Sequence, residues 1–477
     1  MDNKKLKKPE ELEELILSGD DAEIQSFLNL LQRDELLDFL DDHPHFQHPR
    51  LLSNLHPSEI AELLTLLPEK RWGNILKLFD SEQLSALLSE LEDPEVKRML
   101  QRIQSQRLPE LLADMESDDA ADILGELPKA QVHEILNEMP EDEAEPLKRL
   151  LQYKEDTAGG LMQTELIKIS AQNNVAKAIE ELRKQAALED DLDIYEVYVV
   201  DKKGCLEGLI SLDSLILAEP DTPILDLIEP ELYWVHPTLD QEEVVGYFQR
   251  YDLVALPVIG KDRELLGRIT VDDIVNVIEE EASEDILQMA GASGEDLVYD
   301  RILRSTMLRL PWLVTNLGGG LLTGYLMWLF KASLTETLAL ITFVPVITGM
   351  GGNVGTQSSS ITVRGFALNR IDFSNFKSYF FKEMRVGALM GAICGVSLSM
   401  IGWLWHGIPM LGAVVGISLF VAMTLAASTG SLFPAIFEKL NIDPALASGP
   451  FVTTINDVMG ILIYLSTATL CRQWLIH

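Results

Sequence analysis

The feature that most constrains the fold is a run of glycines and amides inside a long apolar segment. Residues 337–363 are mostly apolar, yet they contain the sequence P-V-I-T-G-M-G-G-N-V-G-T-Q between Pro345 and Gln357. On a helix Asn353 and Gln357 share a face, and lipid cannot satisfy their amides. Gly352 and its neighbours also suit close helix packing, but packing alone does not explain the amides. We therefore predict a helix that packs closely and lines a polar path through a membrane.

Five apolar segments, each near the ~20 residues that a bilayer requires, follow one another in the C-terminal part of the chain. They are Met307–Phe330, Thr337–Val363, Val386–Trp405, Met410–Phe433 and Ala445–Leu470. The first residues of the chain are charged and lack the continuous apolar core of a secretory signal, so we expect a cytoplasmic N-terminus.

The basic residues that flank these segments agree with that orientation. Nine of them fall on the cytoplasmic side and two on the outer side, as the positive-inside rule requires. The nine are Arg301, Arg304, Arg309, Arg364, Arg370, Lys377, Lys382, Arg385 and Lys439, and the two are Lys331 and Arg472. We therefore predict a multi-pass protein of the cell inner (plasma) membrane with its C-terminus outside.

Asp457 is the one carboxylate within the five apolar segments. It lies in G-P-F-V-T-T-I-N-D-V-M-G, after Thr454. An ionised group at that depth is costly, so it must face water, a cation or a partner; the alternative is a protonated acid bonded to a neighbouring helix. No His, Cys or Met cluster accompanies it, which favours a hard cation such as Mg²⁺ over a soft metal. In a twofold homodimer, two copies of Asp457 would face one axial ion.

The charge of the chain is divided unevenly. The first 300 residues carry a net charge of −42 and the remainder +5, which together give the −37 of the whole chain. A strongly acidic soluble part argues against nucleic acid and against anionic lipid headgroups as partners, and it favours cations or basic partners. The three cysteines lie far apart and indicate neither a disulfide framework nor a zinc site.

The soluble part divides into a helical region and a mixed region. Leu and Ile recur at threes and fours up to about residue 153, and Leu55–Pro68 matches Met115–Pro128 at an offset of 60, which predicts stacked helical pairs in a short superhelix. Two β-rich sets follow, in which Gly208 and Gly267 lie 59 apart. The second set ends in G-R-I-T-V-D-D, and the pair resembles tandem cystathionine-β-synthase (CBS) domains. In such pairs the Thr and Asp, here Thr270 and Asp273, often contact an adenosine ribose.

An acidic helix is expected to link the two parts. Residues 272–287 contain no glycine or proline, and carboxylates recur on one face without lysines between them. Carboxylates four residues apart repel, so a cation is expected to offset them. The predicted fold class is therefore multidomain: an all-α superhelical N-terminal domain, an α/β tandem CBS pair, a connecting helix and a five-helix transmembrane domain. The predicted boundaries are 1–155, 156–219, 220–271, 272–300 and 301–477.

This organisation resembles the MgtE family of magnesium channels and transporters over essentially the whole chain. The most specific similarities are G-G-N-V-G-T-Q at 351–357, P-F-V-T-T at 450–454 before Asp457, and T-V-D-D at 270–273. The resemblance implies a homodimer whose pore lies on the twofold axis between the second and fifth spans. It also implies that the linking helix acts as a plug and that Mg²⁺ bound between the cytosolic domains keeps the pore closed.

The resemblance extends to individual residues. It implies that Asp457 selects hydrated Mg²⁺, and we expect Asn353, Gln357, Thr454 and Gly352 to shape the path around it. It implies regulatory Mg²⁺ ligands in each cytosolic part, namely Asp118, Asp122, Asp252, Asp273, Glu281, Glu284 and Asp285. Asn276 departs from the acidic residue common at its position in the family. ATP at Thr270 and Asp273 of the CBS domains is a further implied ligand.

Two alternatives remain open at this stage. One is a CBS-regulated transporter for another divalent cation, Co²⁺ or Mn²⁺, and the other is a membrane sensor without flux. The sequence contains no nucleophile with a partnered base, no P-loop and no ATPase signature, so we expect neither an enzyme nor an ATP-driven pump.

Overall fold

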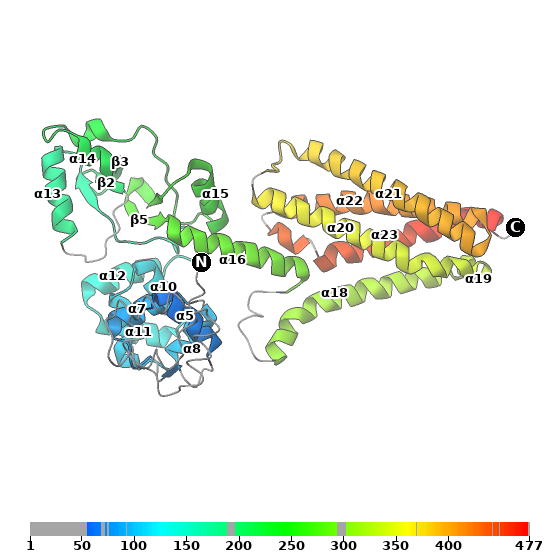
Figure 1. The fold of residues 1–477 in the computed structure, drawn as a ribbon, viewed down its shortest axis with the longest axis horizontal. Coiled ribbons are helices and arrows are strands. Elements are labelled where there is room, and N and C mark those ends of the chain that lie inside the picture. The colour runs from blue at the N-terminus through cyan, green and yellow to red at the C-terminus, as the bar shows by residue number, and fades with distance from the viewer. Residues whose placement is uncertain are drawn as a thin grey trace, which may run out of the picture. The chain divides into compact units, whose positions relative to one another are not determined.

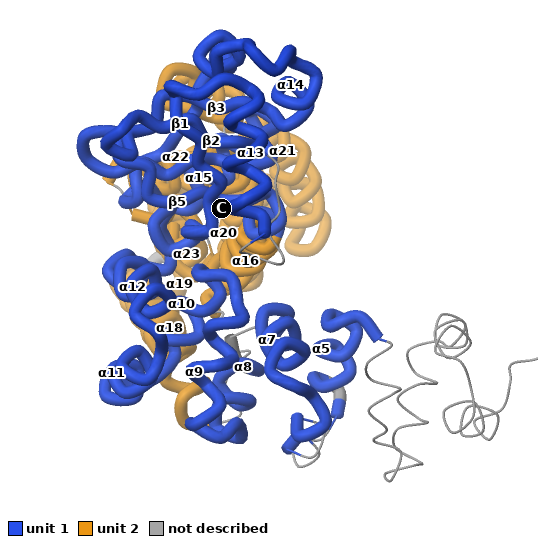
Figure 2. The backbone as a smooth tube through the Cα atoms, turned by 90° about the vertical axis from the view of Figure 1, so that its left-hand side faces the viewer, with its two compact units in different colours: residues 1–275 blue, residues 276–477 orange. Residues whose placement is uncertain are grey.

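The computed structural model describes residues 55–67, 72–73, 76–91, 93–187, 196–292, 302–368, 370–440, 442–447 and 449–475. Residues 1–54 of the predicted N-terminal domain and residues 293–301 of the predicted linker lie outside this range. The chain divides into two compact units, residues 1–275 and 276–477 (Figure 2).

The first part of unit 1 is entirely helical. Its elements are α5 (Pro57–Leu66), α7 (Ser81–Ser89), α8 (Asp93–Leu100), η1 (Ser105–Arg107), α9 (Leu108–Ala113), α10 (Ser117–Gly125), α11 (Lys129–Glu138) and α12 (Glu141–Leu150). The predicted repeat is visible in these bounds, because α5 and α7 recur as α10 and α12 at the offset of 60. The helices stack around one apolar core that includes Leu64, Leu84 and Leu124 (Figure 1).

The helix starts of this domain follow from local sequence. His56 and Glu59 form a capping box at α5, and the Asp80 side chain accepts a hydrogen bond from the backbone N–H of Gln83 at 2.9 Å to begin α7. Prolines occupy the first turns of α5 and α9, where no helical N–H is needed.

Two sheets follow, as the sequence predicts. The first has the order β1 (Lys168–Ser170), β2 (Glu196–Val200) and β3 (Leu206–Ser211), with β1 parallel and β3 antiparallel to β2. The second pairs β4 (Ala255–Ile259) with β5 (Leu265–Thr270). The helices and turns around them are α13 (Val175–Gln185), α14 (Leu212–Leu217), η2 (Ile224–Leu227), α15 (Gln241–Tyr251) and η3 (Lys261–Arg263).

The two sheets repeat each other residue by residue. Val199 pairs with Gly208 in the first hairpin, and Val258 pairs with Gly267 in the second. In both hairpins the register shifts at the next residue, so even the irregularity recurs at the predicted offset of 59. The tandem arrangement inferred from the sequence is thereby confirmed.

The predicted linking helix is α16 (Val271–Ala290), which continues without a break across the predicted domain boundary at residue 271. The helix is followed by Gly291, whose φ of 74° lies in the left-handed region that glycine adopts without strain because it has no Cβ. The N–H of Ala292 bonds to the carbonyl of Leu287 at 2.8 Å, which satisfies an acceptor of the last turn.

Unit 2 otherwise consists of long apolar helices. They are α18 (Ile302–Leu329), α19 (Lys331–Glu336), η4 (Leu338–Phe343), α20 (Val344–Ala367), α21 (Phe376–His406), α22 (Pro409–Lys439), η5 (Pro444–Ala447), α23 (Gly449–Leu470) and α24 (Arg472–Leu475). By length and composition, four segments of the described chain are able to cross a membrane: 338–367, 376–406, 409–439 and 444–470. The first predicted span, Met307–Phe330, corresponds to α18, a helix of 28 residues; that it crosses the membrane stays a prediction.

Helix α22 lies at the centre of this bundle and packs against α20, α21 and α23 (Figure 1). Small residues make the approach close. A Cβ on Gly391 of α21 would lie 2.9 Å from the carbonyl oxygen of Phe420, and a Cβ on Gly402 would lie 3.4 Å from the backbone of Gly412. In lipid, such backbone contact replaces the hydrophobic driving force that packs soluble helices.

Candidate functional site

The predicted path residues lie on two neighbouring helices, α20 and α23. Asn353 and Gln357 are both exposed on one face of α20, while Gly352 beside them is buried. The hydroxyls of Thr356 on α20 and Thr453 on α23 lie 3.3 Å apart. An exposed amide face on a helix within a span is not compatible with lipid, so it requires water or a second protein surface.

Asp457 lies half-buried on α23 and is directed toward the glycine-rich part of α20. A Cβ on Gly352 would be 3.7 Å from Asp457 Oδ1 and 3.1 Å from the methyl group of Thr453. The tight contact of Gly352 is thus with Thr453, and the carboxylate of Asp457 lies beside it at an ordinary van der Waals distance. The structure thus brings Asp457 and Gly352 together, as the sequence predicts.

Thr454 connects this pair of helices to α18. Its hydroxyl donates a hydrogen bond to Asn316 Oδ1 at 2.8 Å, and its methyl group occupies the position that a Cβ on Gly319 would need. Asn316 was not selected from the sequence, although an amide inside an apolar segment is a usable signal.

A second candidate site lies in unit 1, where α10 meets the start of α16. Asp118 is buried and its Oδ1 has no hydrogen-bond partner. Desolvation, followed by repulsion from Asp273, Asp119 and Glu116, raises the pKa of Asp118 well above its ordinary value. Desolvation and the charge of Asp273 likewise raise the pKa of Glu116 to about 7.

Asp273 lies on the other side of this cluster. Desolvation raises its pKa to about 6, opposed by the hydrogen bond that Thr270 donates to its Oδ2 at 2.5 Å. Gln163 Nε2 donates to Glu116 Oε2 at 2.8 Å and also lies 3.5 Å from Asp273 Oδ2. Several carboxylates therefore repel one another around a single amide, a charge distribution that a divalent cation would neutralise.

The cluster differs from the predicted set. Sequence reasoning selected Asp118, Asp122, Asp252 and Asp273 in this unit. The charges that raise the pKa of Asp118 are that of Asp273, which is in the predicted set, and those of Asp119 and Glu116, which are not. Asp122 lies one turn further along α10 and is exposed, and Asp252 ends α15 on an exposed left-handed residue. The roles of these two residues as ligands stay predictions, and Glu116 and Asp119 were missed although they flank Asp118 in the sequence.

The predicted nucleotide contacts overlap with this cluster. The hydroxyl of Thr270 is buried and bonded to Asp273, and the neighbouring Arg268 bonds through Nε to Gln163 Oε1 at 3.3 Å. Thr270 and Asp273 are thus both engaged in the acidic cluster in this structure, and nucleotide binding by these two residues stays a prediction.

A third group of carboxylates lies in unit 2, around the C-terminal half of α16. Desolvation, with repulsion from Asp443 and Glu281, raises the pKa of Asp285 to about 6, and Arg364 opposes this rise. Glu284 also contributes to the repulsion. Asp443 precedes η5, and its Oδ1 accepts a hydrogen bond from the N–H of Ala445 at 2.7 Å. Asp443 was missed because it lies far from the linking helix in the sequence.

The end of α16 also contacts the start of α23. A Cβ on Gly449 would collide with the carbonyl oxygen of Met289, and one on Gly291 would lie 2.9 Å from Pro450 and 3.3 Å from Trp312. The linking helix and the helix that bears Asp457 therefore touch through backbone, so a displacement of one must be felt by the other.

A buried carboxylate in α21 was not anticipated. The helix begins at Phe376, earlier than the predicted span at Val386, because nothing between them breaks it. It therefore contains Glu383, which is 4 % exposed and accepts a hydrogen bond from Ser358 at 3.2 Å. Asp457 is thus not the only carboxylate in the helices that are able to span.

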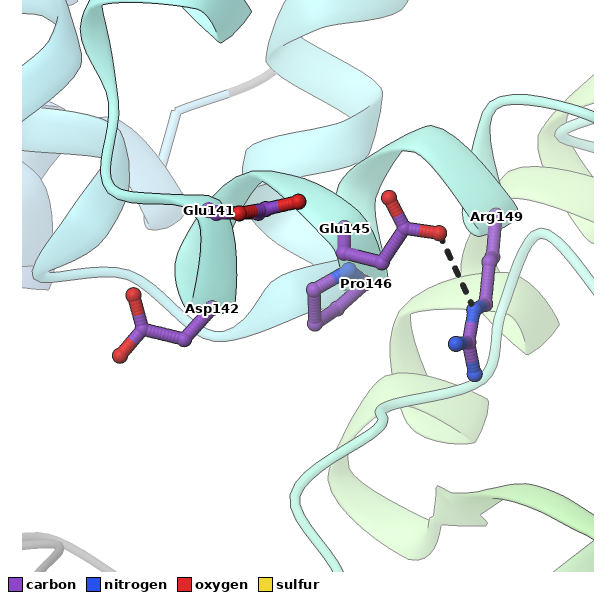
Figure 3. Close-up of a pocket in the computed structure, with 5 residues that line it drawn as sticks. All are labelled: Glu141, Asp142, Glu145, Pro146 and Arg149. Atoms are coloured by element: carbon purple, nitrogen blue, oxygen red, sulfur yellow. Dashed lines mark ion pairs between the residues drawn. The ribbon is translucent and has the colours of Figure 1, made fainter.

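One surface pocket lies apart from these groups. It has a volume of about 590 Å³ and is lined by Glu141, Asp142, Glu145, Pro146 and Arg149 of α12 (Figure 3). Arg149 Nε is 3.9 Å from Glu145 Oε1, an exposed ion pair of adjacent turns. The pocket contains none of the predicted site residues.

Comparison with known proteins identifies the family. A model described as a divalent cation transporter matches residues 344–467, one described as the MgtE intracellular N domain matches 55–156, and the CBS domain model matches 158–221 and 224–280. The magnesium transporter MgtE of Enterococcus faecalis is 39% identical over 334 residues, which cover 70% of this chain and 73% of that protein. The chain belongs to the MgtE family.

Other MgtE relatives agree with this assignment. The magnesium transporter MgtE of Thermus thermophilus is 38% identical over 330 residues, 69% of this chain and 72% of its own. Among solved structures, the soluble part of a magnesium transporter is 33% identical, covers 55% of this chain and 100% of its own, and gives a TM-score of 0.46. The cytosolic domain of the Mg²⁺ channel MgtE in complex with ATP is 30% identical, covers 52% and 100%, and gives 0.47.

The predicted family and fold class are therefore confirmed for this MgtE chain. Among its described residues, no three His, Cys, Asp or Glu side chains converge closely enough to enclose a metal by themselves. The donor chemistry nevertheless fits Mg²⁺. Carboxylates and the Gln163 amide surround Asp118, which carries a buried oxygen without a partner, and three carboxylates together with Arg364 act on Asp285. Mg²⁺ keeps several of its waters, so it needs fewer direct protein ligands than Ca²⁺.

Proposed function

We propose that this chain forms a homodimeric Mg²⁺ channel or transporter of the cell inner membrane, which imports Mg²⁺ down its electrochemical gradient. The observation that carries the proposal is the polar face of α20 and α23, on which Asn353 and Gln357 are exposed and Asp457 is half-buried within segments able to span a membrane. The relatives named as magnesium transporters support the choice of ion.

The two helices of the proposed path contribute different groups: α20 contributes amides and α23 contributes a carboxylate. The amides of Asn353 and Gln357, with the hydroxyl of Thr454, bind the water shell of the ion, and Gly352 lets α23 approach closely through Thr453, beside Asp457. Among the five residues of the proposed path, the carboxylate of Asp457 supplies the charge, and a twofold axis would double it. A hydrated divalent cation then gains twice the attraction of a monovalent one.

Closure is proposed to follow from the acidic groups of the cytosolic part. Without Mg²⁺, repulsion among Asp118, Asp273 and Glu116 in unit 1, and between Asp285 and Asp443 in unit 2, opposes the compact arrangement. Bound Mg²⁺ removes that repulsion and holds α16 against the start of α23. The ion shifts the equilibrium only by its difference in affinity between the two states, and several such sites make the response steep.

The predicted ligands Asp122, Asp252, Glu281 and Glu284 belong to the same proposal. Each is acidic, and Glu281 and Glu284 lie within the charge field of Asp285. We propose that these four residues contribute to Mg²⁺ binding. ATP binding at the CBS domains, a cytoplasmic N-terminus and a C-terminus outside the cell are also parts of the proposal.

The alternatives are another divalent cation, Co²⁺ or Mn²⁺, or a sensor without flux. One experiment separates the proposed function from both alternatives. It measures the flux of a series of divalent ions into proteoliposomes while the Mg²⁺ concentration on the cytosolic side is varied. The proposal expects Mg²⁺ flux that stops as cytosolic-side Mg²⁺ rises. Preferential flux of Co²⁺ or Mn²⁺ would show that one of these ions, and not Mg²⁺, is the transported cation. Absence of any divalent flux from correctly inserted dimers would favour a membrane sensor without transport.

A further inference from the structure

Three membrane helices meet at one buried side chain, Asn456, directly before Asp457 in the sequence. Asn456 is 3 % exposed, although its own helix α23 carries half-exposed residues on either side of it. Its Oδ1 accepts a hydrogen bond from the hydroxyl of Thr429 on α22 at 2.7 Å. The amide is therefore held from one side by a helix that contributes no residue to the proposed path.

The other end of the same amide is directed at α20. Asn456 Nδ2 occupies the position that a Cβ on Gly355 would need, so only glycine admits it there. Nδ2 is buried and has no hydrogen-bond partner in the described structure. The Thr429 hydroxyl also lies 3.0 Å from the carbonyl oxygens of Leu425 and Ala426, so its single proton is shared among three acceptors; in the structure the amide nitrogen of Asn456 is the group that faces α20.

The backbones of α20 and α22 touch at the same level. A Cβ on Gly430 would collide with the carbonyl oxygen of Gly355 and would lie 3.1 Å from the side chain of Ser358. Gly355, Thr429, Gly430 and Asn456 thus form one junction, and each of the three helices supplies part of it. We name these four residues the three-helix junction.

The location of the junction determines what it does. A buried amide fixes both the rotation of α23 about its axis and its distance from α20, because either change would break the bond to Thr429 or drive Nδ2 into backbone. The next residue of α23 is Asp457, whose carboxylate lies against Gly352, one turn before Gly355 on α20. The rotation of α23 therefore sets the direction of the carboxylate.

We propose that Asn456 is the positioning residue for Asp457, and that the three-helix junction sets ion selectivity by fixing where the carboxylate enters the path. The inference rests on the proposed function and adds to it a residue that does not touch the ion. Loss of the junction should loosen the geometry around Asp457 and so reduce discrimination between Mg²⁺ and a cation of different size, without removing the carboxylate.

The sharpest test changes Thr429, because it lies outside the path. Thr429→Val keeps the shape of the side chain and removes the donor, whereas Thr429→Ser keeps the donor and removes a methyl group. We expect the ratio of Mg²⁺ to Ca²⁺ flux in proteoliposomes to fall about five- to tenfold in Thr429→Val, the change that corresponds to one net hydrogen bond. Thr429→Ser should keep the wild-type ratio.

A second pair of variants tests the other end of the amide. Gly355→Ala places a methyl group where Nδ2 lies, while Gly349→Ala on the same helix meets nothing within 4 Å and controls for the change in helix propensity. Only Gly355→Ala should lower the flux ratio. An unchanged ratio in both Thr429→Val and Gly355→Ala would overturn the inference, as would equal loss in Thr429→Val and Thr429→Ser.

Hydrogen exchange gives a readout that does not require flux. Amides of residues 452–458 should exchange about five- to tenfold faster in Thr429→Val than in wild type, and at the wild-type rate in Thr429→Ser. If wild type transports no divalent cation, the proposed function fails, and the exchange result still decides whether the junction holds α23. Identical exchange in all three proteins would reject it.

Discussion

Replacing Asp273 with asparagine should have opposite effects with and without Mg²⁺. In the folded chain the pKa of Asp273 is about 6 against an ordinary 3.8, so keeping it ionised costs up to about 3 kcal/mol at a pH above both values. Asp273→Asn removes that charge and its repulsion of Glu116 and Asp118, and the asparagine oxygen still accepts from Thr270. The cluster should therefore be more stable by about 1 to 3 kcal/mol in a chelator.

With Mg²⁺ present the same substitution should be harmful, because the ion loses a carboxylate. We expect an affinity about tenfold lower, and hence a smaller stabilisation by the ion. Hydrogen exchange of α10 and β5 in the full chain measures both effects. In chelator the variant should exchange more slowly than wild type, and with Mg²⁺ it should gain less protection.

Asp226→Asn, on an exposed residue of η2, is the matched control and should change the exchange in neither condition. A merely structural role for Asp273 would make the variant exchange faster in both conditions. That outcome, or an undiminished response to Mg²⁺, would refute the assignment of this cluster as a cation site.

Three further predictions follow from the same groups. The pKa of Glu116 is raised from 4.5 to about 7, so its contribution to stability is fully present below about pH 4.5 and is lost as the pH rises through about 7. Mg²⁺ should consequently protect the amides of α10 from hydrogen exchange more at pH 8 than at pH 6. Equal protection at the two pH values would contradict this prediction. Asp443→Asn should leave flux at low Mg²⁺ unchanged and raise the Mg²⁺ concentration needed for half-closure about tenfold, measured in proteoliposomes. Gly449→Ala should push the Met289 carbonyl away and weaken closure, seen as residual flux at high cytosolic-side Mg²⁺.

Much of the fold was predictable because the sequence repeats itself. Offsets of 60 and 59 place whole elements, and the shared register shift after Val199 and Val258 shows that each repeat folds by the same local rules. Asp457 could be selected for a different reason, since an ionisable residue in an apolar segment is a candidate functional residue by default.

What the sequence did not predict depends on contacts between distant segments. Asp443 joins the carboxylates of α16 only because the bundle brings η5 beside it, and Glu383 becomes buried only because α21 packs against Ser358 of α20. In the acidic run of α10, periodicity alone did not distinguish Asp119, whose charge reaches Asp118, from Asp122, which is exposed.

The measurement that tests the central claim most directly is Mg²⁺ flux through Asp457→Asn, which keeps the size of the side chain and removes its charge. Asn456 and the helix packing around it are untouched by this change, so the variant should insert and fold as wild type does. The account predicts that Mg²⁺ flux into proteoliposomes is abolished in this variant at every cytosolic-side Mg²⁺ concentration. Undiminished, still Mg²⁺-selective flux would contradict it.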